Sequence, residues 1–222
     1  MQLDEIVGPE RAARLRRIFL GALNDAYTEN CGRYSEDLGD NNLTFAVAVI
    51  HNLRHMLEEA LEYETGVKVT RPHNSFQVEI DSSLAVHFYK GRSGVGGVGE
   101  IRFNESRTKL NLVTENAAQL ALVFEEDTAP FAGREARHLV VVHVGKPTDG
   151  LTDAWIGAPA LSPVNGFQWL WGEGLDGTEV ATVPASDVAA ATPAWLGNSS
   201  LPELIVELRE PGDQAGEANI AP

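Results

Sequence analysis

The most regular hydrophobic pattern lies in the middle of the chain, where a helical repeat is followed by strand-like alternation. From Leu43 to Tyr63, apolar residues recur every three or four positions, which predicts one long amphipathic helix. Asn41 or Asn42 is suited to cap its start, and Gly66 to stop it. The predicted buried stripe consists of Ala46, Ile50, Leu53, Leu57, Ala60 and Leu61. The opposite face is polar and carries His51, Arg54, His55, Glu58, Glu59 and Glu62.

Three short strands are predicted after this helix. Alternation places the apolar residues of Phe76–Ile80 on one face, and it does the same within Leu84–Lys90. A three-residue loop, Asp81–Ser83, keeps the two apolar rows on the same side, because it pairs Ile80 with Leu84 and Phe76 with Phe88. A third strand, Val98–Phe103, follows a glycine-rich connection and completes the predicted meander.

Shorter patterns predict the elements on either side of this stretch. Residues 1–8 are expected to be frayed, and Pro9 is suited to begin a helix that ends near Tyr27. The first half of that helix carries four arginines, which are expected either to form a solvated face or to contact the acidic remainder of the molecule. They are Arg11, Arg14, Arg16 and Arg17.

The second half of the chain is predicted to complete the sheet. A short helix begins at Thr114, although Leu120–Phe124 also fits a strand. His138–Val144 is a continuous, mostly β-branched run, which predicts a strand that is buried on both faces at the centre of the sheet. Thr152–Gly157 and Phe167–Trp171 are predicted as further strands, with Phe167, Trp169 and Trp171 on one face.

The predicted fold class is therefore α+β, with an antiparallel or mixed sheet, a long amphipathic helix packed on it, and the core order αβββαβ. Four regions are expected along the chain. Residues 1–41 form an N-terminal helix and linker, 42–175 the α+β core domain, 176–210 a loop-rich periphery with a short helix beginning near Ser200, and 211–222 a disordered tail.

Charge and composition narrow the functional classes. The formal net charge is −15, which argues against a nucleic-acid binder that works by counterion release. From Lys146 onward there are 11 acidic and 2 basic residues, a balance of −9 that favours a basic partner. Cys31 is the single cysteine and excludes an internal disulfide. No apolar run approaches the ~20 residues of a membrane span, so the expected location is cytoplasmic, without membrane contact.

The element order resembles the αβββαβ core of PD-(D/E)XK nucleases. That resemblance implies a Mg²⁺ site and places Asp81 before the second strand and Glu100 with Arg102 on the third, assisted by a helical acid such as Glu58. The sequence departs from the pattern, because no proline precedes Asp81 and Arg102 stands where lysine is expected. A guanidinium does not exchange protons near neutral pH. A metal-dependent nuclease, or an inactive relative, is therefore the alternative prediction, and Mg²⁺ is the one cofactor it implies.

Two other motifs give weaker evidence for a function. Gly94–Gly99 satisfies the G-x-G-x-x-G spacing but precedes a predicted strand rather than the helix that a dinucleotide site requires. His51 and His55 have the spacing of helical zinc ligands, yet Asn52 follows the first histidine where a metallopeptidase needs glutamate. A polar helix face is the simpler interpretation.

Four aromatic residues in the last third, Trp155, Phe167, Trp169 and Trp171, supply a possible partner surface, since tryptophan anchors many interfaces. They also fit a small core, or a ligand pocket in the case of Phe167, Trp169 and Trp171. Because no catalytic set is complete, the favoured prediction is a non-enzymatic protein-interaction module whose partner is another protein, such as a basic toxin or a metallopeptidase.

A further resemblance rests on six segments of the chain. They are Asn42-Leu-Thr-Phe, His51-Asn-Leu-Arg-His-Met-Leu-Glu-Glu-Ala-Leu61, His87-Phe-Tyr-Lys90, Asn116-Ala-Ala-Gln-Leu120, His143-Val-Gly-Lys-Pro147 and Ile156-Gly-Ala-Pro159. Together they resemble a group of actinobacterial proteins whose genes lie beside those of ImmA/IrrE-type metallopeptidases, in toxin–antitoxin or mobile-element neighbourhoods. The resemblance spans roughly residues 42–175. It implies an interaction protein, such as an antitoxin, and transfers no functional residues.

Overall fold

The computed structural model describes residues 2–72, 75–91, 101, 103, 106–126, 137–161 and 167–177, with side chains beyond residue 117 of the fourth helix left aside. The helices are α1 (Leu3–Val7), α2 (Pro9–Arg33), the 3₁₀ turn η1 (Glu36–Leu38), α3 (Asn42–Ala60) and α4 (Arg107–Glu126). The strands are β1 (Val67–Thr70), β2 (Gln77–Ile80), β3 (Leu84–Lys90), β4 (His138–Lys146), β5 (Gly150–Ala160) and β6 (Gln168–Gly174).

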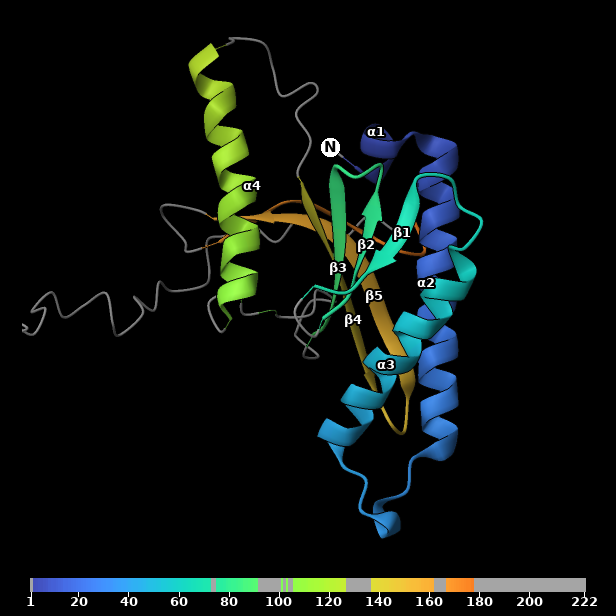
Figure 1. Cartoon of the computed structure of the whole chain (residues 1–222). Helices are drawn as coiled ribbons and strands as arrows, with labels where there is room; N and C mark the ends of the chain where they lie inside the picture. Colours follow the sequence, from blue (N-terminus) through green and yellow to red (C-terminus); the bar gives the residue numbers. More distant parts are fainter. Residues whose placement is uncertain are drawn as a thin grey trace, which may run out of the picture. The chain divides into compact units, whose positions relative to one another are not determined.

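The six strands form one mixed sheet in which the spatial order equals the chain order (Figure 1). All neighbouring strands are antiparallel except β3 and β4, which run parallel and are joined through α4. A parallel pair needs such a crossover, because the chain must return to the end of the sheet where the first strand began before the second strand can run in the same direction. The predicted α+β class and the order helix, three strands, helix, buried strand are confirmed.

The β2–β3 hairpin has the predicted register. Ile80 pairs with Leu84 and Val78 with Val86, and the Phe76 and Phe88 rings stack with centroids 5.3 Å apart. The loop is Asp81–Ser83, and the Ser83 N–H donates to the Ile80 carbonyl. Asp81 and Ser82 have φ values of 50° and 58°, the left-handed conformation that the centre of a mirror-image turn requires.

The third strand of the meander is not the predicted one. Both edges of β3 are occupied, one by β2 and the other by β4, so Val98–Phe103 has no place beside it. The meander is completed on the other side by β1, which pairs with β2. Of the predicted strand, only Ile101 and Phe103 are described, and both are buried under α4. β1 alternates between apolar and polar residues, but it is only four residues long, too short for the pattern to predict a strand.

Helix α2 lies on the sheet and contacts β4 and β5, while α3 packs chiefly on α2 and reaches β1 (Figure 1). Asn41 caps α3 through its side chain, as predicted, and forms a capping box with Thr44. Leu53, Leu57 and Leu61 are buried as predicted, but the stripe is rotated. The structure buries Phe45 and Val49 and leaves Ala60 exposed.

The chain is ordered from near its start, which corrects the prediction of a frayed beginning. Helix α1 buries Leu3, and the Leu3 N–H donates to Glu173 Oε1 at 3.2 Å. Pro9 begins α2 as predicted. Three of the four clustered arginines contact acidic groups elsewhere in the molecule: Arg11 with Asp81, Arg14 with Glu64, and Arg16 with both Asp4 and Glu173.

The sheet separates two hydrophobic clusters. Alternate residues of β4 point to opposite faces, so Leu139 and Val141 join α1, α2 and α3 in the first cluster. Val140 and Val142 join Leu112 and Val113 of α4 in the second. β4 is thus buried on both sides at the centre of the sheet, as its apolar run predicted.

Helix α4 begins at Arg107, seven residues before the predicted start, and continues through the segment that also fitted a strand. The first turn was missed because residues 107–111 are mainly polar and exposed, so they carry no apolar stripe. Within the described residues, no helix has the length and apolar character needed to cross a membrane. The predicted helix near Ser200 and the 211–222 tail lie outside them.

Candidate functional site

Asp81, the first acid of the predicted nuclease set, is bound by an arginine of α2. Arg11 Nη1 lies 2.5 Å from Asp81 Oδ2, and Nη2 donates to Asp81 Oδ1 at 3.1 Å and to the Thr65 carbonyl. This hydrogen bonding and the adjacent positive charge lower the pKa of Asp81. Glu100 and Arg102 lie outside the described residues, so their relation to Asp81 stays a prediction.

Glu58, the proposed helical acid, is likewise held by cations. Arg71 donates two hydrogen bonds to its Oε1, at 2.5 and 3.1 Å, and Arg54 lies 3.8 Å from the same oxygen. Across the part of the chain that the structure describes, no three His, Cys, Asp or Glu side chains converge as metal ligands. His51 and His55 are exposed and contact Arg54 and Glu59 of their own helix.

The four aromatic residues do not form one surface. Trp155 and Trp171 are only 1% and 5% exposed, which leaves them no area to offer a partner. Trp155 lies under α4, with its ring centroid 4.3 Å from that of the half-buried Trp169. Phe103 packs edge-on against both Trp169 and Phe167. These rings belong to the second hydrophobic cluster. Of the alternatives considered for the aromatic residues, a small core is the one that fits this arrangement.

Trp171 points to the other face, contrary to the prediction that Phe167, Trp169 and Trp171 share one. The pairing of β5 with β6 passes from Ala158–Trp171 to Pro159–Trp169, so Leu170 is an extra residue in β6. Such a bulge shifts the alternation by one residue. Trp171 therefore joins the first cluster, while Phe167 and Trp169 pack against the second.

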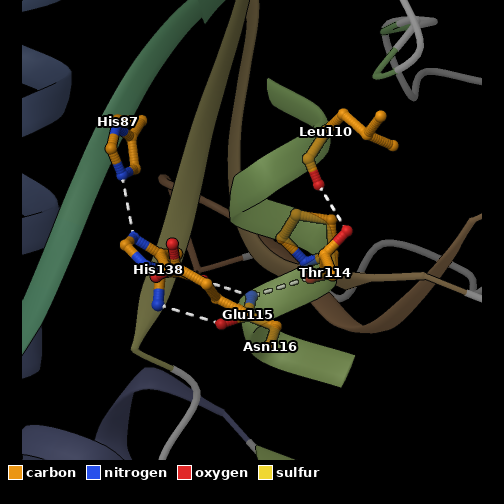
Figure 2. A network of polar contacts seen from close by, with 7 residues as sticks. His87, Leu110, Thr114, Glu115, Asn116 and His138 are labelled. Carbon is orange, nitrogen blue, oxygen red and sulfur yellow. Dashed lines mark hydrogen bonds and ion pairs between the residues drawn. The ribbon is translucent and has the colours of Figure 1, made fainter. Parts of the chain in front are cut away.

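A chain of polar side chains connects the sheet to α4 at the start of the parallel strands (Figure 2). His87 Nε2 on β3 lies 3.1 Å from His138 Nδ1 on β4, and His138 Nε2 lies 2.7 Å from Glu115 Oε2 on α4. His87 is buried, and burial together with the neighbouring His138 lowers its pKa to about 4. The chain runs from a neutral imidazole in the interior to an exposed carboxylate.

Asn116 fixes this arrangement from the next position of α4. Its Nδ2 donates to the carbonyls of His138 and Pro159 at 2.8 and 2.7 Å, and its Oδ1 accepts from the His138 N–H at 3.1 Å (Figure 2). One buried amide thereby joins α4 to β4 and β5. The ring nitrogens of His87 and His138 face each other within hydrogen-bond distance, an arrangement suited to sharing a proton. The network is chiefly a polar link between layers.

A second buried histidine lies on the opposite face. His143 on β4 is fully buried, and its Nδ1 lies 2.9 Å from the hydroxyl of Tyr27 on α2. Burial, and to a smaller extent the charge of Lys90, lowers the pKa of His143 to about 3. His138 and His143 thus point to opposite sides of β4, because they are five residues apart on a strand whose side chains alternate. His143 is neutral at physiological pH.

Between the end of α2 and the start of α3 lies an open groove of about 640 Å³, here named the α2–α3 groove. Its lining is part apolar and part polar. The apolar and aromatic residues are Tyr34, Leu43, Phe45, Val47 and Ala48, and the polar ones are Asn30, Arg33, Asp40, Thr44, His51 and Asn52. Phe45 is buried and forms the floor, where the Tyr34 ring meets it edge-on at 5.8 Å. Leu43 and Val47, one helical turn apart on α3, are 73% and 62% exposed.

The connection between the two helices adds another exposed apolar residue and several charges. Leu38 of η1 is 86% exposed. Glu36 and Asp37 are exposed beside it, and Asp40 accepts a hydrogen bond from the Ser35 N–H. Arg33 is ion-paired with Glu29 at 2.8 Å. The end of the groove at η1 therefore combines an apolar wall with negative charge.

Sequence reasoning missed both the His87–His138–Glu115 chain and the α2–α3 groove. The histidines are far apart in sequence, and only the parallel β3–β4 register brings them together. A signal for the groove was present, because Leu43 and Val47 are apolar residues that fall outside the predicted stripe of their helix. An apolar residue off the buried stripe is a candidate for a binding surface.

In comparisons with known proteins, no family model matches the chain, and no curated protein or solved structure matches it significantly.

Proposed function

We propose that this chain is a cytoplasmic, non-enzymatic protein-interaction module that binds its partner through the α2–α3 groove. The observation that carries the proposal is the exposure of Leu43 and Val47 along one wall of the groove. Leu38, in the connection between the two helices, is exposed as well. Large apolar side chains gathered beside a concave surface are typical of protein-binding sites. A basic toxin or a metallopeptidase is the kind of partner for which such a module serves as an antitoxin or accessory subunit.

The shape of the groove favours a protein over a small molecule. A groove of about 640 Å³ lies within the range of small-molecule sites, but those sites enclose most of their ligand. Here the apolar walls remain largely exposed to solvent, so a small ligand would keep much of its surface in water. A helix or loop of a partner covers such walls more completely.

The floor of the groove is already organised for binding. Tyr27 of α2 and Tyr34, the residue that follows α2, both pack against Phe45, with ring centroids 5.9 and 5.8 Å away. Lys90 Nζ lies 5.2 Å from the centroid of the same ring. A floor held by three neighbours loses little conformational freedom when a partner binds, which lowers the entropic cost of association.

The proposal is tested by affinity capture with the tagged full-length chain from lysate of its host. Leu43→Lys with Val47→Lys places two charges in the groove wall, and we expect the captured partner to be lost. Tyr63→Lys is the matched control, because Tyr63 is 88% exposed and lies outside the groove. Circular dichroism checks that all variants are folded. A partner that binds the double variant as well as the parent contradicts the proposal.

A further inference from the structure

The dimensions of the α2–α3 groove fit two turns of a helix. Its α3 wall extends from Leu43 through Val47 to His51, residues four apart that follow one line along the helix. Eight residues of α-helix rise about 12 Å. An amphipathic helix places apolar side chains at positions i, i+4 and i+7, which span about 10 Å. Such a helix can therefore seat its anchors between Leu43 and His51.

The charges around the groove are uneven. At the η1 end, Glu36 and Asp37 are exposed, and Asp40 lies at the groove itself. The nearest cation, Arg33, is already paired with Glu29. At the other end His51 is accompanied by Arg54, whose Nη2 lies 3.3 Å from His51 Nε2. The negative potential is therefore concentrated where the two helices of this chain are connected.

A second copy of this chain does not complement that potential. The chain carries a formal net charge of −15, and pairing two identical acidic ends across a symmetric interface brings like charges together. A partner with Lys or Arg at the corresponding end gains electrostatic attraction instead. Charge complementarity of this kind mainly raises the association rate and selects the orientation of binding.

Resting on the proposed function, we infer that the occupant of the α2–α3 groove is an amphipathic helix of a partner protein. Its apolar side chains at i, i+4 and i+7 contact Leu43, Val47 and the half-buried Ala48. Lys or Arg residues at one end of that helix lie against Glu36 and Asp37. This is the helix-in-groove mode of recognition with a defined direction of the bound helix.

Two synthetic peptides of about 15 residues test this inference. Both carry leucines at i, i+4 and i+7 on a helix-favouring background; one ends in three lysines, the other in three glutamates. Binding to the full-length chain is followed by fluorescence anisotropy at low and high salt. We expect the lysine peptide to bind about tenfold more tightly at low salt, and salt to reduce the difference. Leu43→Lys with Val47→Lys should abolish binding of both.

A charge exchange provides the decisive comparison. Glu36→Lys with Asp37→Lys should reverse the preference, so that the glutamate peptide binds more tightly. The matched control is Glu10→Lys with Glu62→Lys, which changes the net charge equally at two exposed positions outside the groove. The control should keep the preference of the parent chain. If it reverses the preference as well, the effect follows net charge, and the inference is wrong.

The other outcomes separate the two proposals. If capture of a cellular partner depends on Leu43 and Val47 but neither peptide binds, the groove binds a protein of another kind, so this inference fails and the proposed function stands. If a dimer of the full-length chain forms in light scattering and is lost on Leu43→Lys with Val47→Lys, a second copy is the occupant, and the inference is overturned. If neither capture nor peptide binding depends on these residues, both proposals fail.

Discussion

The two faces of the sheet are closed in different ways. On the face covered by α1, α2 and α3, a large apolar cluster extends over five strands and is bordered by ion pairs from α2, such as Arg16 with Glu173. On the face covered by α4, a smaller cluster of aromatic and aliphatic side chains is accompanied by the His87–His138–Glu115 chain and the Asn116 amide.

This difference indicates how each layer is stabilised. Apolar burial is non-directional, and the free energy it contributes grows with the area removed from water. A buried amide, in contrast, depends on a few bonds of defined geometry, and losing it leaves its partners unsatisfied. We therefore expect the α2 face to tolerate local changes, and α4 to depend on single polar residues.

Acidification should have the largest effect, because each face buries a neutral histidine. The folded-state pKa is about 4 for His87 and about 3 for His143, below the unfolded value of 6.5. Above pH 6.5 their contribution to stability is complete. As the pH falls below 6.5, the unfolded chain binds protons first, and each histidine lowers the unfolding free energy by about 1.4 kcal/mol per pH unit. The two together amount to roughly 5 kcal/mol by pH 4.5.

Urea denaturation between pH 7.5 and 4.5 measures this dependence. His87→Gln and His143→Gln should each remove about half of the slope, whatever they do to the absolute stability. Equal slopes in the parent and both variants would contradict the assignment. A slope that only one variant reduces would show that one face alone senses acid, and would sharpen the comparison between the faces.

Asn116→Ala should have an intermediate and local effect. The substitution leaves the His138 N–H and carbonyl and the Pro159 carbonyl without their bonds to α4, at a cost of about 2–3 kcal/mol. Hydrogen exchange should accelerate in α4 and change little in α2. Thr114→Ala is the matched control in the same turn, because Thr114 is exposed and its hydroxyl bonds only within the helix. If exchange became equally faster in both helices, the two faces of the sheet would not be stabilised independently of each other.

Changes at Asp81 should have the smallest effect, although this residue links α2 to the β2–β3 turn. Its side chain is 56% exposed, and exposed ion pairs contribute about 1 kcal/mol or less. Asp81→Asn, which tolerates the left-handed conformation, should cost about 0.5 kcal/mol. Asp81→Ala should cost about 1–2 kcal/mol more, because alanine is strained at a φ of 50°. The urea midpoints of the two variants measure this; an Asn variant as unstable as the Ala variant would place the effect in the ion pair.

Much of the fold was predictable because its signals are local. The β2–β3 register followed from the alternation around a three-residue loop, and the buried β4 from an uninterrupted apolar run. The errors arose where tertiary contacts override the pattern. The bulge at Leu170 turned Trp171 to the other face. The first turn of α4 was missed for a different reason, because residues 107–111 are mainly polar and exposed.

The candidate sites were less predictable than the fold. The contact between His87 and His138 exists only because β3 and β4 are parallel neighbours, a pairing that no local pattern encodes. The α2–α3 groove depends on the angle at which two helices meet, so a sequence shows only that Leu43 and Val47 lie off the buried stripe. The arginines of α2 were expected either in solvent or against acidic groups, and deciding between these required knowing which strands α2 covers.

The single parallel step in an otherwise sequential sheet has a consequence for how the chain assembles. The hairpins β1–β2–β3 and β4–β5–β6 form between neighbours in sequence, whereas β3 and β4 meet only after the whole α4 excursion has been closed. Loop closure of that length carries an entropic cost that local hairpins avoid. We therefore expect the two meanders to fold early and the pairing of β3 with β4 to form last. The hydrogen bonds between Asn116 and His138 then hold α4 against β4.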